Sequence, residues 1–85
     1  MKTPNEIDKM IAERIRVIRK RRKISQKKLS EKSGVSLGSV KRFEQSGEIS
    51  LSALTKIAIA LEIESELLDL FKEVPFQSIE EIING

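Results

Sequence analysis

The chain has no cysteine, no histidine and no tyrosine among its 85 residues. Without cysteine it can form neither a disulfide bond nor a thiolate metal site. Without histidine it lacks the commonest metal ligand and the usual general base near neutral pH. The carboxylates that remain are typical of a solvated surface, so we expect the protein not to be an enzyme and to hold no metal or cofactor.

Long apolar runs are absent as well. The longest, residues 57–61, has five residues, whereas a membrane-spanning helix needs about 20. The first six residues include no apolar stretch of the kind found in signal peptides. With 39% hydrophobic residues, the composition predicts one small domain that folds in the cytoplasm, away from membranes.

The net charge of +3 conceals an uneven distribution of charge along the chain. Residues 1–42 carry 14 Lys or Arg and 4 Asp or Glu, a net charge of +10. Residues 43–85 carry 2 Lys and 9 Asp or Glu, a net charge of −7. The basic half predicts a surface for a polyanion, and we expect the acidic half to face away from it.

Apolar residues recur with the period of a helix, and no stretch alternates with the period of a strand. Isoleucines at positions 7, 11, 15 and 18 form one stripe, which predicts a helix over residues 6–22. Asn5 is a suitable N-cap for this helix.

Serine residues stand where the N-caps of further helices would lie. They are Ser25 before residues 26–33, Ser36 before 37–45, Ser50 before 51–61, and Ser78 in a Ser-x-x-Glu capping box before 79–84. A further helix is predicted over residues 66–71, between the helices over residues 51–61 and 79–84. The sequence therefore predicts an all-α fold, with a five-helix domain over residues 6–72 and a short helical extension over residues 73–85. The second half of the chain is expected to supply core residues, namely Leu51, Leu54, Ile57, Ala58, Leu61, Ile63, Leu67 and Leu68.

The most informative stretch is residues 26–44, where two short helices are joined by Gly34-Val35-Ser36. This arrangement is typical of a helix-turn-helix, whose second helix enters the major groove of DNA. Leu29, Val35, Val40 and Phe43 are placed to pack the two helices together. Helix pairs with a glycine turn also occur in proteins that do not bind DNA, so geometry alone leaves both readings open.

A wider set of residues carries a family resemblance. These residues are Ile15-Arg16, Ile18-Arg19-Lys20, Ile24-Ser25-Gln26, Leu29, Gly34-Val35-Ser36, Val40, Arg42-Phe43-Glu44 and Leu51-x-x-Leu54-x-x-Ile57-Ala58-x-Ala60-Leu61. With this spacing, the run from Ile11 to Phe71 resembles the phage repressor and Cro-type helix-turn-helix domain of small XRE-like regulators. The resemblance covers roughly 60 of the 85 residues and implies binding to double-stranded DNA as a homodimeric transcriptional repressor.

The resemblance also implies a set of DNA-binding residues. They are Arg19, Gln26, Lys27, Ser36, Leu37, Gly38, Ser39, Lys41 and Arg42. Gln26 stands at a helix start, where free N–H groups favour a phosphate. Arg42 is the best candidate for a base contact, because its guanidinium can bridge guanine O6 and N7.

Leu37 and Gly38 depart from the family pattern, which usually has polar side chains at these positions. Leucine offers only apolar contact, for example to a thymine methyl, and glycine offers a close backbone approach. Specificity is then expected to rest partly on DNA shape. The alternative is a recognition surface that has been altered or lost.

Arg19 and Glu44 are predicted to form an ion pair that holds the third helix against the first. Arg19 follows Ile15 by four residues, and Glu44 follows Val40 by four, so both lean toward the buried faces of their helices. The family has an ion pair at the matching positions, with the arginine also near the DNA backbone. The alternative is two solvated charges.

The C-terminal extension is rich in apolar residues that a five-helix domain hardly needs. The expected dimer or partner contact comprises Phe71, Val74, Phe76, Ile79, Ile82 and Ile83. Packing of this tail on its own domain is an alternative. Two other functions stay open: an antitoxin-type autoregulator that also binds an unidentified protein, and a protein-interaction module that has lost DNA binding.

Overall fold

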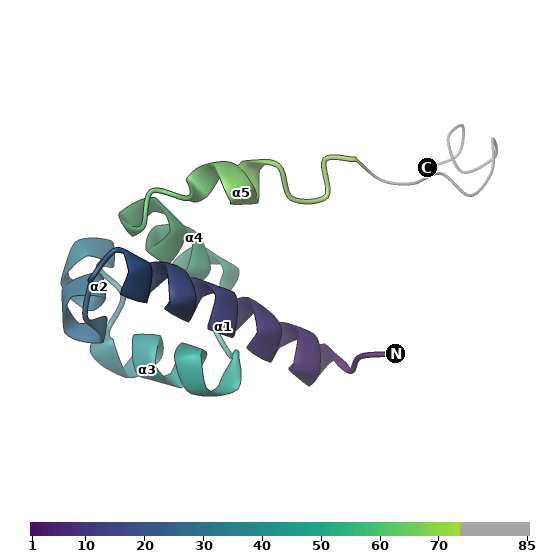
Figure 1. The fold of residues 1–85 in the computed structure, drawn as a ribbon, viewed down its shortest axis with the longest axis horizontal. Coiled ribbons are helices and arrows are strands. Elements are labelled where there is room, and N and C mark those ends of the chain that lie inside the picture. The colour runs from purple at the N-terminus through teal and green to yellow at the C-terminus, as the bar shows by residue number, and fades with distance from the viewer. Residues whose placement is uncertain (74–85) are drawn as a thin grey trace.

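The structure is a computed structural model that describes residues 1–73, and every regular element in that range is a helix (Figure 1). The helices are α1 (Pro4–Arg21), α2 (Gln26–Ser33), α3 (Leu37–Ser46), α4 (Leu51–Ala60) and α5 (Glu64–Leu68). The all-α prediction is confirmed. The helix predicted over residues 79–84 lies outside the described residues. Each helix of the described part is too short or too polar to cross a bilayer.

In the view of Figure 1 the long helix α1 crosses the middle of the molecule, with α3 below it, α4 and α5 above it, and α2 beside its C-terminal end. Helix α1 packs against α3, and α2 packs against both α3 and α4. The main contact of α5 is with α4. The helix-turn-helix pair is thus held between α1 and α4.

Side-chain caps begin the first four helices. The Oγ atoms of Ser25, Ser36 and Ser50 accept hydrogen bonds from backbone N–H groups three residues later, at 3.0, 3.1 and 3.1 Å. These caps confirm the starts predicted for α2, α3 and α4.

The start predicted for α1 is wrong by two residues, because Thr3, and not Asn5, is its N-cap. Thr3 Oγ1 accepts from the Glu6 N–H at 3.2 Å, and the Glu6 carboxylate accepts from the Thr3 N–H at 3.3 Å. Pro4 occupies the first helical position, where its missing N–H costs nothing and its fixed φ suits a helix. The reciprocal capping box and the proline together outweigh a lone asparagine.

The bounds predicted for α5 are also wrong. The sequence predicts residues 66–71, whereas the helix begins at Glu64 and ends at Leu68. Ile63 occupies the N-cap position without a side-chain cap, and its N–H donates to Ala58 O at 2.9 Å. Phe71 has a φ of +60°, which a continuing right-handed helix does not allow.

The core lies where α1, α2, α3 and α4 meet. Its buried side chains are Ala12, Ile15, Leu29, Val35, Val40, Phe43, Ile57, Ala58 and Leu61. The core prediction is wrong for two residues, because Leu51 is 71% exposed and Leu68 is 77% exposed. Leu51 is the first residue of α4, and Leu68 is the last residue of α5.

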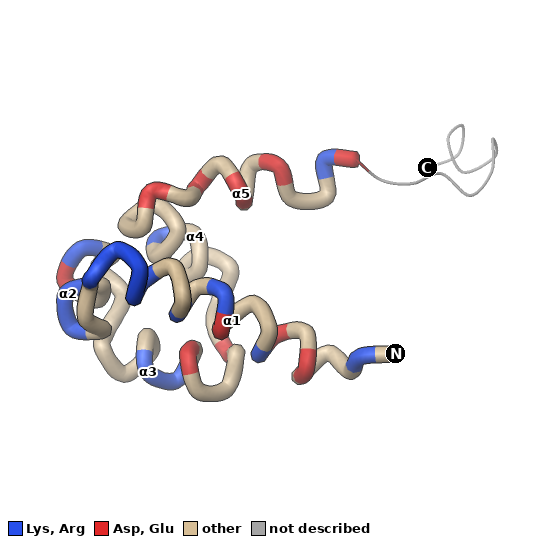
Figure 2. Tube along the Cα trace, in the orientation of Figure 1, with Lys and Arg blue, Asp and Glu red and all other residues tan. Residues whose placement is uncertain are grey.

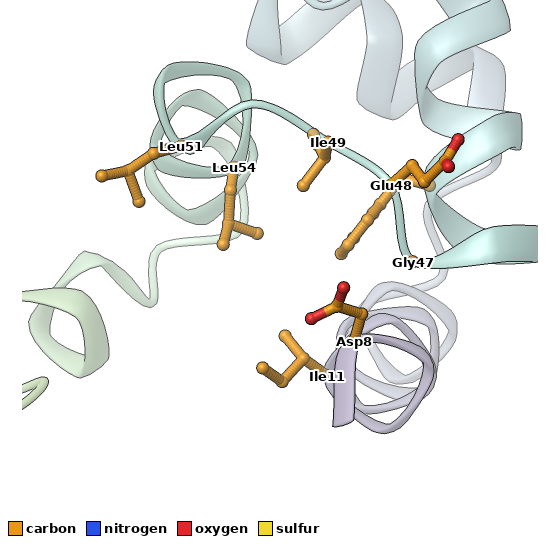
Figure 3. Close-up of a pocket in the computed structure, with 8 residues that line it drawn as sticks. Asp8, Ile11, Gly47, Glu48, Ile49, Leu51 and Leu54 are labelled. Carbon is orange, nitrogen blue, oxygen red and sulfur yellow. The ribbon is translucent and has the colours of Figure 1, made fainter. Parts of the chain in front are cut away.

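The isoleucine stripe of α1 is only partly buried. Ile15 is covered, but Ile7 and Ile11 are exposed. Figure 3 shows Ile11 beside Asp8 on α1, facing Leu54 of α4 across an open groove. The groove has a volume of about 420 Å³, and Phe43 and Gly47 contribute to its lining. The N-terminal half of α1 therefore extends along a partly open apolar channel.

Glycines end α2 and α3 in the left-handed conformation, at Gly34 with φ +76° and at Gly47 with φ +82°. A Cβ at Gly34 would meet no atom within 4 Å, whereas a Cβ at Gly47 would lie 2.7 Å from the backbone carbon of Asp8. Gly47 is therefore required both by its own φ and by the close approach of α1.

Three glycine-to-alanine variants should form a graded series of stability. Gly38→Ala lies in a helix in open space and should stabilise the fold by up to about 1 kcal/mol. Gly34→Ala should cost about 1–2 kcal/mol through its left-handed conformation alone. Gly47→Ala should cost clearly more, because the Asp8 backbone must also move. Urea denaturation measures all three, and equal costs at Gly34 and Gly47 would contradict the close approach.

Candidate functional site

The turn between α2 and α3 is fixed by three local interactions. Gly34 supplies the left-handed residue, the Ser30 Oγ donates to Val35 O at 2.6 Å, and the Val35 N–H donates to Ser33 Oγ at 3.1 Å. Below the turn, Leu29 and Val40 are fully buried. The orientation of α3 relative to α2 is thus determined by both hydrogen bonds and packing.

An ion pair joins α1 to α3 beneath the exposed surface. Arg19 Nε donates to Glu44 Oε2 at 2.7 Å, and Arg19 NH2 donates to Glu44 Oε1 at 2.9 Å. The two side chains are only 9% and 5% exposed. The third guanidinium nitrogen, NH1, donates to Ile24 O at 2.8 Å in the connection between α1 and α2. The two residues that the sequence pairs are therefore in bidentate contact.

Gln26 adds a third helix to this network. Its Nε2 donates to Glu44 Oε1 at 3.1 Å, so α1, α2 and α3 all meet at one carboxylate. Burial alone would raise the pKa of Glu44. The hydrogen bonds from Arg19 and Gln26, and the charges of Arg19 and Arg16, outweigh burial and hold that pKa below its ordinary value.

The exposed face above this network is positively charged and spans three helices. Arg16 of α1, Gln26 of α2 and Lys41 of α3 line a shallow surface depression of about 350 Å³, together with Glu44 and Gln45. Figure 2 shows lysine and arginine concentrated on the C-terminal half of α1 and on α2, and acidic residues along the segment that contains α5. Among residues 1–73, most of the lysine and arginine thus lies apart from the acidic residues of the α5 segment, while Glu44 and Glu48 lie in and directly after α3.

Along α3, Val40 and Phe43 are buried, while Gly38, Ser39, Lys41 and Arg42 are exposed and Leu37 is half-buried. Ser36 caps the helix and also donates from its hydroxyl to Ser39 Oγ at 2.9 Å. Because Gly38 is helical and a Cβ there would meet nothing within 4 Å, the fold itself does not require a glycine at this position. The exposed face of α3 is therefore flat at its N-terminal end.

The structure engages five of the predicted DNA-binding side chains in contacts within the protein: Ser36 and Ser39, which bond each other, and Arg19, Gln26 and Arg42. Arg19 is buried and bonded through all three guanidinium nitrogens, and Gln26 donates to Glu44. Arg42 is exposed but forms an ion pair with Glu48, at 2.6 Å from NH2 to Oε2. Phosphate and base contacts by these residues remain predictions. Lys27 is exposed on α2.

Two of these contacts could not be found from periodicity. Arg42 and Glu48 are six residues apart and separated by the end of α3, so no helical spacing relates them. Gln26 and Glu44 lie on different helices.

The expected dimer or partner contact is described only at Phe71, which is 82% exposed. The other members, Val74, Phe76, Ile79, Ile82 and Ile83, lie outside the described residues. Leu68 and Leu70, close to Phe71 in sequence, are also exposed, at 77% and 51%. An exposed apolar cluster therefore lies at the end of α5.

Comparison with known protein families gives one match. A family model described as "Helix-turn-helix" matches residues 15–68, which is 54 of the 85 residues. The match begins at Ile15 in α1 and ends with α5, so it includes the ion pair, the glycine turn and all of α3. Comparisons with curated proteins and with solved structures gave no match.

Glu44→Gln should destabilise the protein by on the order of 3 kcal/mol at neutral pH, because it leaves the buried Arg19 without a counter-charge. Since the folded-state pKa of Glu44 is lowered from 4.5, its contribution to stability is present above that value and is lost as the pH falls through the lower pKa. The difference between wild type and variant in free energy of unfolding should therefore shrink in acid.

Urea titrations at several pH values measure this difference. The matched control is Glu13→Gln, which removes the acid of an exposed pair with Arg16 and should cost no more than about 0.5 kcal/mol. A pH-independent difference, or an equal cost for the two variants, would contradict the role given to Glu44.

Proposed function

The chain belongs to the XRE and Cro/C1 type of helix-turn-helix proteins, a family of DNA-binding transcription regulators, and on this premise we propose that it binds specific double-stranded sites as a homodimeric repressor. The observation that carries the proposal is the single basic face that α1, α2 and α3 form together around Arg16, Gln26 and Lys41. A face contributed by three helices matches the way this motif lies on DNA, with one helix in the groove and its neighbours along the backbone.

Phosphate binding is assigned to basic and polar side chains of α1, α2 and α3 and of the connections between them. The set comprises Arg16, Lys20, Arg21, Arg22, Lys23, Gln26, Lys27, Lys28, Ser36, Ser39 and Lys41, and Arg19 supports it from below. Contacts of this kind give affinity and salt dependence without reading sequence. The acidic residues near α5 would be repelled by phosphate and so orient the domain with α3 toward the duplex.

Base reading is assigned to the exposed face of α3. Arg42 can donate two hydrogen bonds to guanine, and Leu37 can contact a thymine methyl. Gly38 allows the helix backbone to approach the base edges closely, which gives a reason for a glycine that the fold does not need. With so few long polar side chains, DNA shape is expected to supply part of the specificity.

Dimerisation is assigned to the exposed cluster of Leu68, Leu70 and Phe71, continued by the apolar residues after position 73. Exposed apolar clusters typically mark contact surfaces. A symmetric dimer would place two α3 helices on half-sites one helical turn, about 34 Å, apart. Occupation of such a site within a promoter is sufficient for repression.

Selection of bound sequences from random duplex DNA tests the proposal directly. Wild-type protein should enrich a palindrome, and Arg42→Ala should lose preference for guanine at one position of each half-site, a discrimination of roughly five-fold or more. Arg14→Ala removes the same charge from an exposed position of α1 and should leave the enriched sequence unchanged. The absence of any enrichment by wild type at low salt would contradict DNA reading and favour a protein-interaction module.

Substitution of Phe71 tests the dimer in the full-length chain. Phe71→Asp places a charge in the exposed cluster and should shift the sedimentation equilibrium toward monomer, because a buried unpaired carboxylate opposes association. Ile59→Asp adds the same charge at another exposed apolar residue, on α4, and should leave the mass unchanged. A wild-type mass that Phe71→Asp does not alter would count against this surface.

A further inference from the structure

An acidic residue lies directly beside the arginine assigned to base reading. Glu48 Oε2 accepts a hydrogen bond from Arg42 Nε at 2.8 Å and lies 2.6 Å from Arg42 NH2 in the same ion pair. Both side chains are largely exposed, at 71% for Arg42 and 62% for Glu48. An exposed pair of this kind contributes little to folding, and a carboxylate near the DNA face weakens binding to phosphate. Its presence therefore calls for a reason other than stability.

The turn after α3 holds Glu48 in this place. Gly47 takes the left-handed conformation that reverses the chain against Asp8. The Ser46 Oγ donates to Arg42 O at 2.7 Å and accepts from the Glu48 N–H at 3.2 Å, which ties the backbone of Glu48 to the last turn of the helix. The turn thus fixes the backbone of Glu48 beside the helix from which Arg42 projects.

The geometry of the pair decides which edge of the guanidinium stays available. One carboxylate oxygen of Glu48, Oε2, lies against the edge of the guanidinium formed by Nε and NH2. Among the hydrogen bonds within residues 1–73, none involves NH1 of Arg42. The edge formed by NH1 and NH2 is the one that Glu48 leaves open, and its two N–H groups can donate to the O6 and N7 acceptors of guanine.

We propose that Glu48 is a positioning residue for sequence specificity, which holds Arg42 with its terminal edge toward a guanine and opposes its binding to phosphate. The inference rests on the proposed function, because it acts only through a DNA contact of Arg42. Specificity is a difference between two affinities, and Glu48 increases it from both sides. It orders the side chain for the correct base and repels the backbone that every sequence shares.

The test is the ratio of dissociation constants for a random duplex and for the selected site, measured by fluorescence anisotropy at several salt concentrations. Glu48→Ala should bind the random duplex more tightly and the selected site no more tightly, so that the ratio falls by roughly five-fold or more. Replacing the contacted guanine by 7-deazaguanine should weaken wild type more than Glu48→Ala, a readout that a purely structural role would not move.

A double-mutant cycle separates this role from a general effect of charge. In the Arg42→Ala background, Glu48→Ala should leave the ratio unchanged. The matched control Glu66→Ala removes the same charge from α5 and should leave the ratio at the wild-type value. A ratio that Glu48→Ala does not change, or a change that persists without Arg42, would overturn the inference.

These outcomes are distinct from failure of the proposed function. If wild type enriches no sequence, DNA reading itself is wrong and the inference falls with it. If wild type enriches a palindrome and Glu48→Ala behaves like Glu66→Ala, only the role of Glu48 is wrong. Thermal unfolding of Glu48→Ala should match wild type, because the pair is exposed.

Discussion

The buried contact between Arg19 and Glu44 is the interaction on which the candidate DNA face depends. The guanidinium of Arg19 donates three hydrogen bonds, and the carboxylate of Glu44 accepts three. A charge pair tolerates burial when both partners are hydrogen-bonded in this way. The pair joins α1 to α3, and Gln26 brings α2 to the same carboxylate. One small polar network therefore joins, from beneath, the three helices that form the basic face.

Two glycines shape the ends of the helix that this network holds. Gly34 ends α2 in the left-handed conformation before α3 begins, and Gly47 ends α3 in the same way beside Asp8. The second turn also brings Glu48 to Arg42, so a requirement of the fold and a feature of the DNA face coincide. Gly38 is different, since neither its φ nor its surroundings require it, and its reason lies in what approaches α3 from outside.

Much of the fold could be predicted from local signals. The serine caps and the glycines that end α2 and α3 act within a few residues, and the structure has those helices at or within one residue of the predicted bounds. The start of α1 differs from the prediction because Thr3 and Glu6 form a capping box, which begins the helix two residues before the start that an Asn5 cap would give. The exposure of Leu51, Leu68, Ile7 and Ile11 could not be predicted, because helical period gives the face of a residue and not whether a neighbouring helix reaches it. The same limit applies to the site: spacing pointed to Arg19 and Glu44, but the contact of Arg42 with Glu48 depends on a turn that has no period.

On the proposed function, the face formed by α1, α2 and α3 binds DNA while the acidic segment near α5 faces away. This orientation can be measured from the change in backbone amide chemical shifts of isotope-labelled protein when a duplex carrying the selected site is added. We expect the largest changes around Gln26 and along the exposed face of α3, with small changes in α5 beyond those of a dimer present before DNA is added. Largest changes in α5, or none in α3, would contradict it.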